Sequence, residues 1–281
     1  MKHNTLLVSI LFVSLAFIAS ACAGINNQDP NTSTFEQVAK NGTVRVGVRF
    51  DNPPLSFITE DGQWVGFDVD LANALVDELG FEIDMVKVDG TTRISFLQED
   101  KIDLAVASMN HTRSRDDAID FSITYFWDNQ SFLIRKGTYS SLDEIMGAKV
   151  AANAGSSTID SWKSFSEKNG GPDPEIVEFT DKLAAMQALR DGVVEGYTED
   201  NITLLALAAG DPNLELIPGG HNQVQFGIGL PVNDSKWRDQ VNYALQELWK
   251  NGTYQEIYDK WFVGSDAAVP LPLSGQMEIW P

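Results

Sequence analysis

The sequence predicts an α/β protein made of two units, each with a largely parallel sheet covered by helices. Strand-like and helix-like segments alternate from residue 43 to about 133. The alternation restarts after residue 137 and runs to about 230, where two amphipathic helical segments follow. Such alternation favours parallel strands joined by helices, and 281 residues suffice for two domains of ordinary size.

Local patterns define the first unit. The valine-rich alternation in TVRVGVRF predicts a strand over 43–50. Apolar residues at helical spacing in GFDVDLANALVDELG predict a helix over 66–80, with Gly80 at its C-terminal cap. The remaining segments of this unit are a strand over 81–88, a short helix over 92–100 and a strand over 102–108.

The second unit repeats the pattern, and closing helices follow it. Strands are predicted over 148–155, 175–179, 193–200, 214–219 and 224–233. Helices are predicted over 157–170, 181–192, 201–210, 236–252 and 253–262. The last segment, GSDAAVPLPLSGQMEIWP, contains three prolines and is predicted to lie extended over the surface.

The chain is strongly acidic, with 40 Asp and Glu against 20 Lys and Arg and a formal net charge of −20. Nucleic-acid phosphates and anionic lipid surfaces both attract basic patches, so this composition argues against either partner. Self-repulsion of this size favours a soluble monomer.

Residues 1–21 predict a secretory signal peptide. Lys2 precedes an apolar run, from Leu6 to about Ile18, that is too short to span a bilayer. The only cysteine, Cys22, follows, and ASAC resembles a bacterial lipobox. That resemblance implies a lipid anchor at Cys22, outside the cytoplasmic membrane, in the periplasm or at the cell surface. The alternative is a plain signal peptide with an unrelated cysteine. The anchor and a flexible, polar tether are assigned to 22–42.

Several motifs carry a resemblance to a known family. The segments VGVRFDNPPLSF, GQWVGFDVDLANAL, TRISFLQEDKIDLAVASM, RSRDDAIDFS, AGSST and VVEGYTED occur in one order. This order resembles that of the extracellular solute-binding proteins of polar amino-acid ABC transporters, above all the glutamate/aspartate-binding subgroup. The resemblance implies a two-lobed periplasmic-binding-protein-like type II fold, an amino-acid ligand, no cofactor and a membrane permease as partner.

The resemblance also implies how the chain divides. The first lobe would contain 43–133 and 232–281, and the second lobe 134–231. The segments FLIRKG and FGIGLPV would form two hinge strands at the borders, and the ligand would bind in the cleft between the lobes. Contact with both lobes would shift an equilibrium between open and closed forms.

Arg115 matches the family arginine that holds the α-carboxylate of the ligand. A guanidinium suits this role because its planar donors fit a carboxylate and it stays charged when desolvated. Taken alone, Arg115 is more simply a surface arginine paired with Asp116 or Asp117. The surrounding motif favours the ligand role, whereas Arg113 is assigned to the solvated surface.

Backbone donors are expected to share that carboxylate. Ser108, Met109 and Asn110 lie where the strand DLAVAS ends, and ligands bind at such strand ends. In the second lobe, Ser156 and Ser157 precede a helix and would offer N–H groups at its positive N-terminus. A plain N-cap is the alternative role for Ser157, and the two roles are compatible.

Asp200 matches the family acid that accepts the ligand ammonium. It ends the predicted strand VVEGYTED, at the carboxyl end where ligands bind. The alternative is that Asp200 caps the helix beginning at Asn201.

Arg49 and Arg93 match arginines that face the side-chain carboxylate in the glutamate/aspartate subgroup. Together with the arginine of the α-carboxylate site, they would complement a ligand with two carboxylates and one ammonium. The alternative is that both pair with nearby acids such as Asp51 and Asp89. A neutral polar amino acid such as glutamine would then be the ligand.

The sequence contains no recognisable catalytic motif. G-x-S-x-G, Walker A and H-E-x-x-H patterns are missing, and histidines at positions 3, 111 and 221 are too scattered for a zinc site. We therefore expect a binding protein with no catalytic residue and no metal. Two alternatives remain: a cyclohexadienyl or arogenate dehydratase on the same fold, with Glu199 as its acid, and a sensor input for a receptor.

Overall fold

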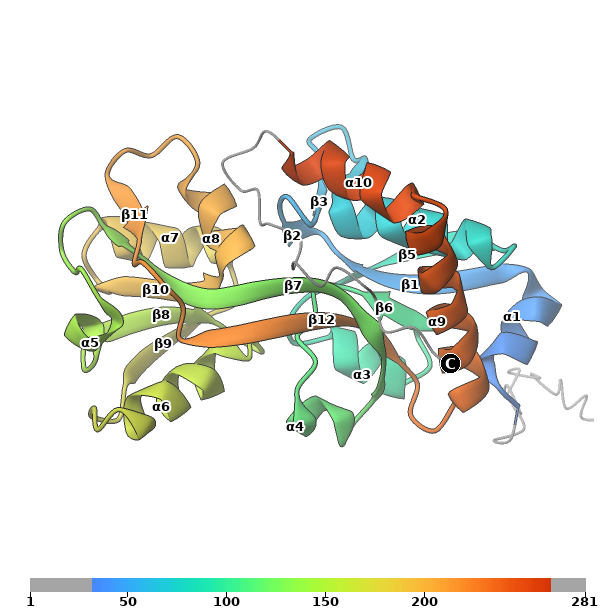
Figure 1. The fold of residues 1–281 in the computed structure, drawn as a ribbon, viewed down its shortest axis with the longest axis horizontal. Coiled ribbons are helices and arrows are strands. Elements are labelled where there is room, and N and C mark those ends of the chain that lie inside the picture. Colours follow the sequence, from blue (N-terminus) through green and yellow to red (C-terminus); the bar gives the residue numbers. More distant parts are fainter. Residues whose placement is uncertain (1–31, 264–281) are drawn as a thin grey trace, which may run out of the picture. The chain divides into compact units, whose positions relative to one another are not determined.

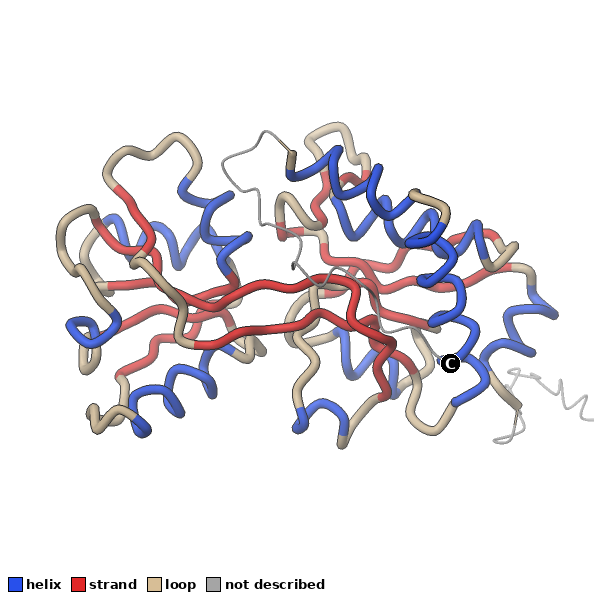
Figure 2. Tube along the Cα trace, viewed as in Figure 1, coloured by secondary structure: helices blue, strands red, loops and turns tan. Residues whose placement is uncertain are grey.

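The computed structural model describes residues 32–263, and one mixed sheet runs through both lobes (Figures 1 and 2). Its strands follow the order β5 (Glu82–Val88), β1 (Thr43–Arg49), β6 (Leu104–Val106), β12 (Asn222–Leu230), β7 (Asp120–Arg135), β10 (Gly196–Asp200), β8 (Lys149–Asn153) and β9 (Glu175–Phe179). The ladders are parallel at each end, and antiparallel around β7 and β12. A further strand, β11 (Leu214–Leu216), pairs with β7.

Strand β6 explains why helices cover both faces of the sheet in the first lobe. Leu104 and Val106 point to the core that contains α2 (Phe67–Glu78), while the alanines beside them point to the core that contains α3 (Arg93–Gln98). Side chains of a strand alternate between its two faces, so a strand that is apolar at every position needs a cover on each side. Both helices were predicted from the sequence within a few residues.

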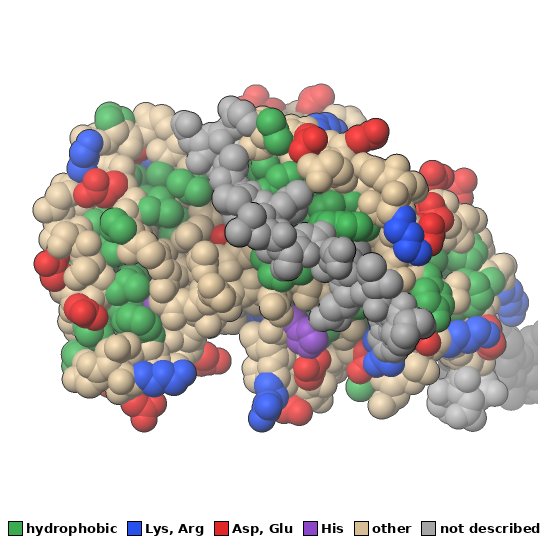
Figure 3. All heavy atoms as spheres, viewed as in Figure 1, with side chains coloured by type: hydrophobic (Ala, Val, Ile, Leu, Met, Phe, Trp, Pro, Cys, Tyr) green, Lys and Arg blue, Asp and Glu red, His purple; other side chains and the backbone are tan. Residues whose placement is uncertain are grey.

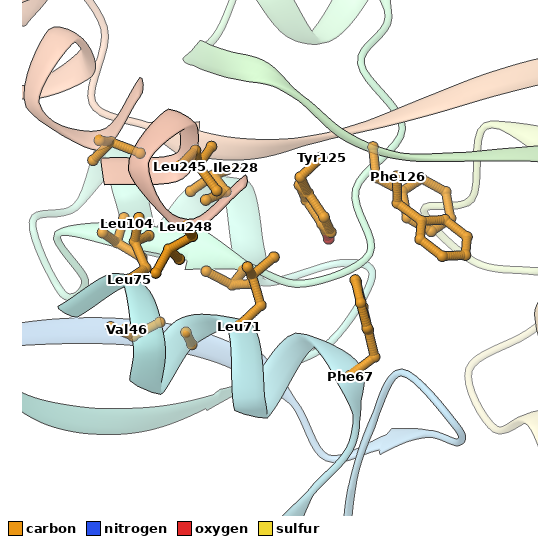
Figure 4. Packing of buried hydrophobic residues seen from close by; sticks show 14 of the residues in the cluster. Val46, Phe67, Leu71, Leu75, Leu104, Tyr125, Phe126, Ile228, Leu245 and Leu248 are labelled. Carbon is orange, nitrogen blue, oxygen red and sulfur yellow. The ribbon is translucent and has the colours of Figure 1, made fainter. Parts of the chain in front are cut away.

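The closing helices complete the larger core of the first lobe. Figure 4 shows Leu71 and Leu75 of α2 close to Leu245 and Leu248, which belong to α9 (Ser235–Lys250). The last described helix, α10 (Thr253–Phe262), adds aromatic side chains to the same core. Helices α9 and α10 thus return the chain to the lobe that contains β1, and the predicted extended segment over 264–281 lies outside the described residues.

A helix precedes the first strand, where the sequence was assigned to a tether. Helix α1 (Thr34–Asn41) begins after Ser33, whose side chain accepts a hydrogen bond from the backbone N–H of Phe35. Val38 is buried against the first-lobe core. The predicted tether over 22–42 is therefore wrong for 34–41, because an N-cap and a short apolar face are enough to form and dock this helix. Cys22 and the predicted signal peptide lie outside the described residues.

The second lobe has the same two-sided cover. In β7, Leu133 packs with helices α7 (Lys182–Arg190) and α8 (Asn201–Ala208). Its neighbours Phe132 and Ile134 point to the opposite core, which holds two further helices. These are α5 (Leu142–Ile145) and α6 (Thr158–Lys168). Phe132 and Leu133 thus pack in the second lobe, although the predicted border assigns them to the first.

Strands β7 and β12 connect the two lobes (Figure 1). Phe126 packs in a first-lobe core and Phe132 in a second-lobe core, so the chain crosses between them at 127–131. Opposite this crossing, Asn222 of β12 pairs with Gln130 of β7. The predicted hinge segment FLIRKG, residues 132–137, lies wholly beyond this crossing, because its apolar side chains already pack in the second lobe.

A few short elements were not predicted. Strands β2 (Asp51–Asn52), β3 (Ser56–Ile58) and β4 (Trp64–Val65) form a separate small sheet, and α4 (Arg113–Asp116) precedes β7.

On the face drawn in Figure 3, Lys and Arg side chains lie singly among acidic ones. Among residues 32–263, no helix has both the length and the apolar character needed to cross a membrane.

Candidate functional site

A small cavity lies where strand ends from both lobes meet. It is lined by seven of the residues predicted to bind the ligand: Arg49, Arg93, Ser108, Asn110, Ser156, Ser157 and Asp200. They come from the ends of β1, β6 and β10, the start of α3 and the segments that lead into α4 and α6. The cavity volume is about 10 Å³, roughly what one water molecule needs. An amino acid can enter only if the lobes move apart.

Arg115 reaches across the cleft from α4. Its Nη1 donates to the carbonyl oxygen of Asn110 at 2.7 Å, and its Nη2 donates to the carbonyl oxygen of Gly155, in the second lobe, at 2.9 Å. Arg115 is only 9% exposed. Asp116 does not pair with it but accepts from His111 Nε2 at 2.8 Å. The alternative of a solvated surface arginine paired with Asp116 or Asp117 is therefore wrong, because Arg115 is buried and forms no ion pair with either of these described residues.

Arg93 is buried beside the cavity, and no carboxylate of residues 32–263 pairs with it. Its Nη1 donates to the carbonyl oxygens of Ala107 and Ser108, at 2.7 and 3.1 Å. Within the described part of the chain, its Nε has no hydrogen-bond partner. Ser108 has a φ of 48°, a left-handed conformation that costs a non-glycine residue about 1 kcal/mol or more. Asp89 does not pair with Arg93, because its carboxylate accepts from the backbone of Thr92 and its neighbour.

Arg49 behaves differently, as the alternative interpretation expected. Its Nε and Nη2 donate to the two carboxylate oxygens of Asp51, at 3.0 and 3.1 Å. This bidentate pair neutralises Arg49. For Arg93, burial and the positive charges of Arg115 and Arg49 lower the pKa well below its usual value. An anion beside Arg93 would stabilise its charged form and oppose this lowering of the pKa.

Asp200 points its carboxylate into the cleft rather than at its own helix. It occupies the N-cap position of α8 but makes no side-chain cap bond. Asp128, on β7, supplies that bond instead, accepting from the backbone N–H of Ile202 at 3.0 Å. The oxygen Oδ1 of Asp200 accepts from Asn110 Nδ2 at 3.1 Å and from Gln130 Nε2 at 3.0 Å. The alternative role of Asp200 as a side-chain cap is therefore wrong.

Glu199 is held in an ion pair behind Asp200. Its Oε1 lies 2.8 Å from Lys182 Nζ, and its Oε2 accepts from Ser156 Oγ at 2.9 Å. Burial alone would raise the pKa of Glu199, but Lys182, Arg49 and Ser156 together hold the pKa below its usual value. Burial and the charge of Glu199 raise the pKa of Asp200 to about 6.

Asn110 and Ser157 join the two lobes at the cavity. Nδ2 of Asn110 donates to Ser157 Oγ at 2.8 Å as well as to Asp200. Among the described residues, Oδ1 of Asn110 has no hydrogen-bond partner. The N–H of Ser156, a predicted donor to the ligand, donates to the carbonyl oxygen of Asn153 in this structure, and its role toward a ligand stays a prediction. The Ser156 side chain lines the cavity nonetheless.

The side chains of Met109 and Ser108 make their contacts inside the first lobe. Met109 is fully buried in a first-lobe core and its side chain does not line the cavity, while its role as a backbone donor stays a prediction. Ser108 Oγ donates to Asp68 at 2.6 Å, and Asp68 also accepts from Tyr125. Burial raises the pKa of Asp68 to about 6.

Two glycines allow the lobes to approach each other at the edge of the cavity. A Cβ atom added to Gly90 would lie 2.9 Å from the carbonyl oxygen of Ala154 in the second lobe. A Cβ added to Gly155 would meet the carbonyl oxygen of Gly90 in return. Because Gly90 lacks the left-handed conformation, its requirement for glycine is purely one of space between the lobes.

Sequence reasoning missed Gln130, Lys182 and Gly90 in this site. Gln130 lies in a strand that the sequence analysis recognised only in part, and Lys182 resembles an ordinary first-turn residue of a surface helix. The GTTR segment between a strand and a helix was a usable signal for Gly90. Within 32–263, no group of three or more His, Cys, Asp or Glu side chains is arranged to hold a metal ion.

Known proteins resemble this chain over most of its length. The family of bacterial extracellular solute-binding proteins, family 3, matches residues 44–264. The ABC transporter glutamine-binding protein GlnH of Bacillus subtilis is 30% identical over 269 residues, which cover 92% of this chain and 97% of that protein. The glutamate-binding protein GluB of Corynebacterium glutamicum is 24% identical over 270 residues, covering 89% and 90%.

Solved structures share the fold. An ancestral arginine-binding protein bound to glutamine has a TM-score of 0.72 at 34% identity, covering 79% of this chain and 98% of that one. Together with the mixed sheet and its helical covers, this similarity confirms the predicted class, a periplasmic-binding-protein-like type II fold.

Gly90→Ala is expected to weaken ligand binding without unfolding the protein. The added methyl group would push against Ala154 only when the lobes approach, and overpacking costs roughly 1 kcal/mol or more, about fivefold in affinity. Titration calorimetry with the amino acid that binds best would measure the loss, and thermal unfolding without ligand serves as the control. Unchanged affinity would show that binding does not need this approach.

Proposed function

The chain belongs to the bacterial extracellular solute-binding proteins of family 3, and from that membership we propose that it captures glutamate or aspartate and delivers it to an ABC transporter permease. It acts as a monomer outside the cytoplasmic membrane. Relatives that bind glutamine and glutamate support an amino acid as the ligand. The observation that carries the acidic choice is a pair of buried arginines, Arg93 and Arg115, that have no anionic partner among residues 32–263.

Two of the cations around the cavity are already balanced. Arg49 is paired with Asp51, and Lys182 is paired with Glu199. A paired charge offers little to a ligand, because binding would first have to break its existing bonds. These four residues therefore shape the site more than they attract a charge.

Arg93 and Arg115 remain, facing Asp200. Among the described residues, the two guanidinium groups donate only to backbone carbonyl oxygens. A ligand with an α-carboxylate on Arg115, an ammonium on Asp200 and a second carboxylate near Arg93 would complete three charge pairs. Charge-assisted bonds are the strong ones in such sites, and micromolar affinity needs only about −8 kcal/mol.

Glutamine is the second candidate, and one observation favours it. The pairing of Arg49 with Asp51 removes one of the two arginines expected to face a second carboxylate. A side-chain amide would still offer a carbonyl oxygen to Arg93. That arrangement leaves a buried charge without an anion, which costs more than the same site with a carboxylate.

The geometry gives little support to an enzyme. Glu199, the candidate acid of a dehydratase, is paired with Lys182 at 2.8 Å, and its pKa is held below its usual value. A general acid must carry a proton near the working pH, whereas this carboxyl is ionised there. We propose that the protein binds its ligand without changing it.

Arg115→Ala is expected to abolish glutamate binding, because truncating one partner of a buried charge pair costs roughly 2–5 kcal/mol, or at least about thirtyfold. Arg113→Ala, on the same short helix but exposed, is the matched control and keeps the wild-type affinity. Arg93→Gln is expected to reduce glutamate affinity more than glutamine affinity. Titration calorimetry on protein refolded to remove bound ligand measures all three.

Glutamate or aspartate should give the tightest binding among the twenty amino acids in that experiment. If glutamine binds tightest and Arg93→Gln leaves the ratio of glutamine to glutamate affinity unchanged, the acidic assignment is wrong. Full glutamate affinity in Arg115→Ala would remove Arg115 from the site.

No turnover is expected when the purified protein is incubated with prephenate or arogenate. Product formation, followed by absorbance or chromatography, would favour a dehydratase instead. Loss of that activity in Glu199→Gln would then identify the acid.

A lipid anchor at Cys22 is the remaining part of the proposal. Cells expressing the full chain should incorporate labelled palmitate into it, and Cys22→Ser should abolish the label and release the protein from membranes. Membrane retention of the unlabelled Cys22→Ser protein would contradict the anchor. Neither result affects the ligand assignment.

A further inference from the structure

Gln130 is a fully buried polar side chain at the crossing between the lobes. It lies in β7 within 127–131, the stretch that belongs to neither core, and it is 0% exposed. A buried side-chain amide is costly unless both its donors and its acceptor find partners. Its burial at a hinge therefore needs an explanation in its contacts.

All the hydrogen-bonding capacity of Gln130 is used. Its Nε2 donates to Asp200 Oδ1 at 3.0 Å and to Ser157 Oγ at 3.1 Å. Its Oε1 accepts from Ser161 Oγ at 2.6 Å and from Asn222 Nδ2 at 3.1 Å. A side-chain amide has two N–H donors and two acceptor lone pairs, so no capacity is left over.

The orientation of this amide follows from its neighbours. The Asp200 carboxylate, when ionised, can only accept, and the Asn222 nitrogen can only donate. Turning the amide over would set oxygen against oxygen at Asp200 and nitrogen against nitrogen at Asn222. Both contacts therefore require the same orientation of the amide.

These four contacts come from different parts of the second lobe and its hinge. Asn222 lies on β12 and is directly opposite Gln130 across the two hinge strands. Ser157 and Ser161 lie at the N-terminus of α6, and Asp200 ends β10. One side chain thus connects both hinge strands to the carboxylate proposed to receive the ligand ammonium.

We propose that Gln130 is a positioning residue that holds the Asp200 carboxylate in place relative to the hinge strands β7 and β12. Recognition of the ligand ammonium by Asp200 then depends on how these two strands are arranged. The inference rests on the proposed function through the role of Asp200. In this role Gln130 contacts no ligand atom and acts only through Asp200.

Electrostatics supports this geometry. Burial and the neighbouring Glu199 charge raise the pKa of Asp200 to about 6, and the donors of Gln130 and Asn110 oppose that rise. Without the Gln130 donor, the pKa of Asp200 would rise further. Asp200 also interacts electrostatically with ionisable groups on other elements. These are Asp128 on β7, Lys182 on α7, Arg93 on α3, Arg115 on α4 and Tyr197 on β10.

The sign of the pH effect follows directly. Ammonium binding requires ionised Asp200, so affinity is lost as the pH falls through the pKa of that carboxyl. Loss of the Gln130 donor raises this pKa and moves the loss of affinity to a higher pH. A side chain with only a packing role would change affinity or stability without moving that midpoint.

Gln130→Met tests the proposal, since methionine has a similar length and no donor. Glutamate affinity, measured by titration calorimetry between pH 5 and pH 8.5, is expected to fall about tenfold at pH 7, and the acid midpoint is expected to move up. Gln223→Met, on the exposed side of β12, is the matched control and should equal the wild type. An unchanged acid midpoint in a folded Gln130→Met protein would overturn the proposal.

A milder variant covers the case in which Gln130→Met does not fold. Ser161→Ala removes one donor to Oε1 and leaves Gln130 in place, so the amide is held less firmly against Asp200. The acid midpoint should move in the same direction by a smaller amount. A midpoint identical to that of the wild type would count against the positioning role.

Asp200→Asn separates this inference from the proposed function. If Asp200→Asn keeps full glutamate affinity, the ammonium site is elsewhere and the proposed function fails at this residue. If Asp200→Asn loses affinity while Gln130→Met matches the wild type at every pH, only the positioning role fails. In a double variant with Asp200→Asn, Gln130→Met should have no further effect on the pH profile.

Discussion

Two buried guanidinium groups that pair with no carboxylate of the described residues set the main constraint on this structure. Among the described residues, Arg93 and Arg115 donate only to backbone carbonyl oxygens, and each of them is less than one-tenth exposed. Carbonyl dipoles soften the cost of such burial but do not cancel the charge. Ser108 adopts a left-handed backbone conformation that brings its carbonyl oxygen to Arg93, and this conformation is energetically unfavourable for a non-glycine residue. Because the described residues supply no carboxylate to these two arginines, the cleft is expected to attract an anionic ligand.

The path of the chain makes this concentration of charge possible. Strands β7 and β12 pass between the lobes, so the ends of β1, β6 and β10 meet at one cavity although they are far apart in the sequence. Parallel ladders turn the same ends of their strands toward one edge. Close approach of the lobes then depends on backbone contact at Gly90 and Gly155, where no side chain can intervene. The two buried arginines, the strand ends and the two glycines thus all lie around the same cavity.

Sequence patterns predicted the repeated α/β elements and most of the cleft, because both depend on local order along the chain. They failed where side chains have partners that a local pattern does not single out. Arg49 was expected to face a second carboxylate, but Asp51 is two residues away and forms the pair. Gln130 and its partners come from four elements that no local pattern connects.

The division of labour between Asp128 and Asp200 illustrates how a helix end can be satisfied without using up a binding group. An Asp at an N-cap position ordinarily bonds the first N–H groups of its helix. Here the hinge-strand carboxylate of Asp128 accepts from Ile202, and burial together with the charge of Asp200 raises the pKa of Asp128 to about 8. A cap that tends to hold a proton near neutral pH adds less negative charge beside Asp200. The ionised form of Asp200 is thereby kept available to a cation from outside the protein.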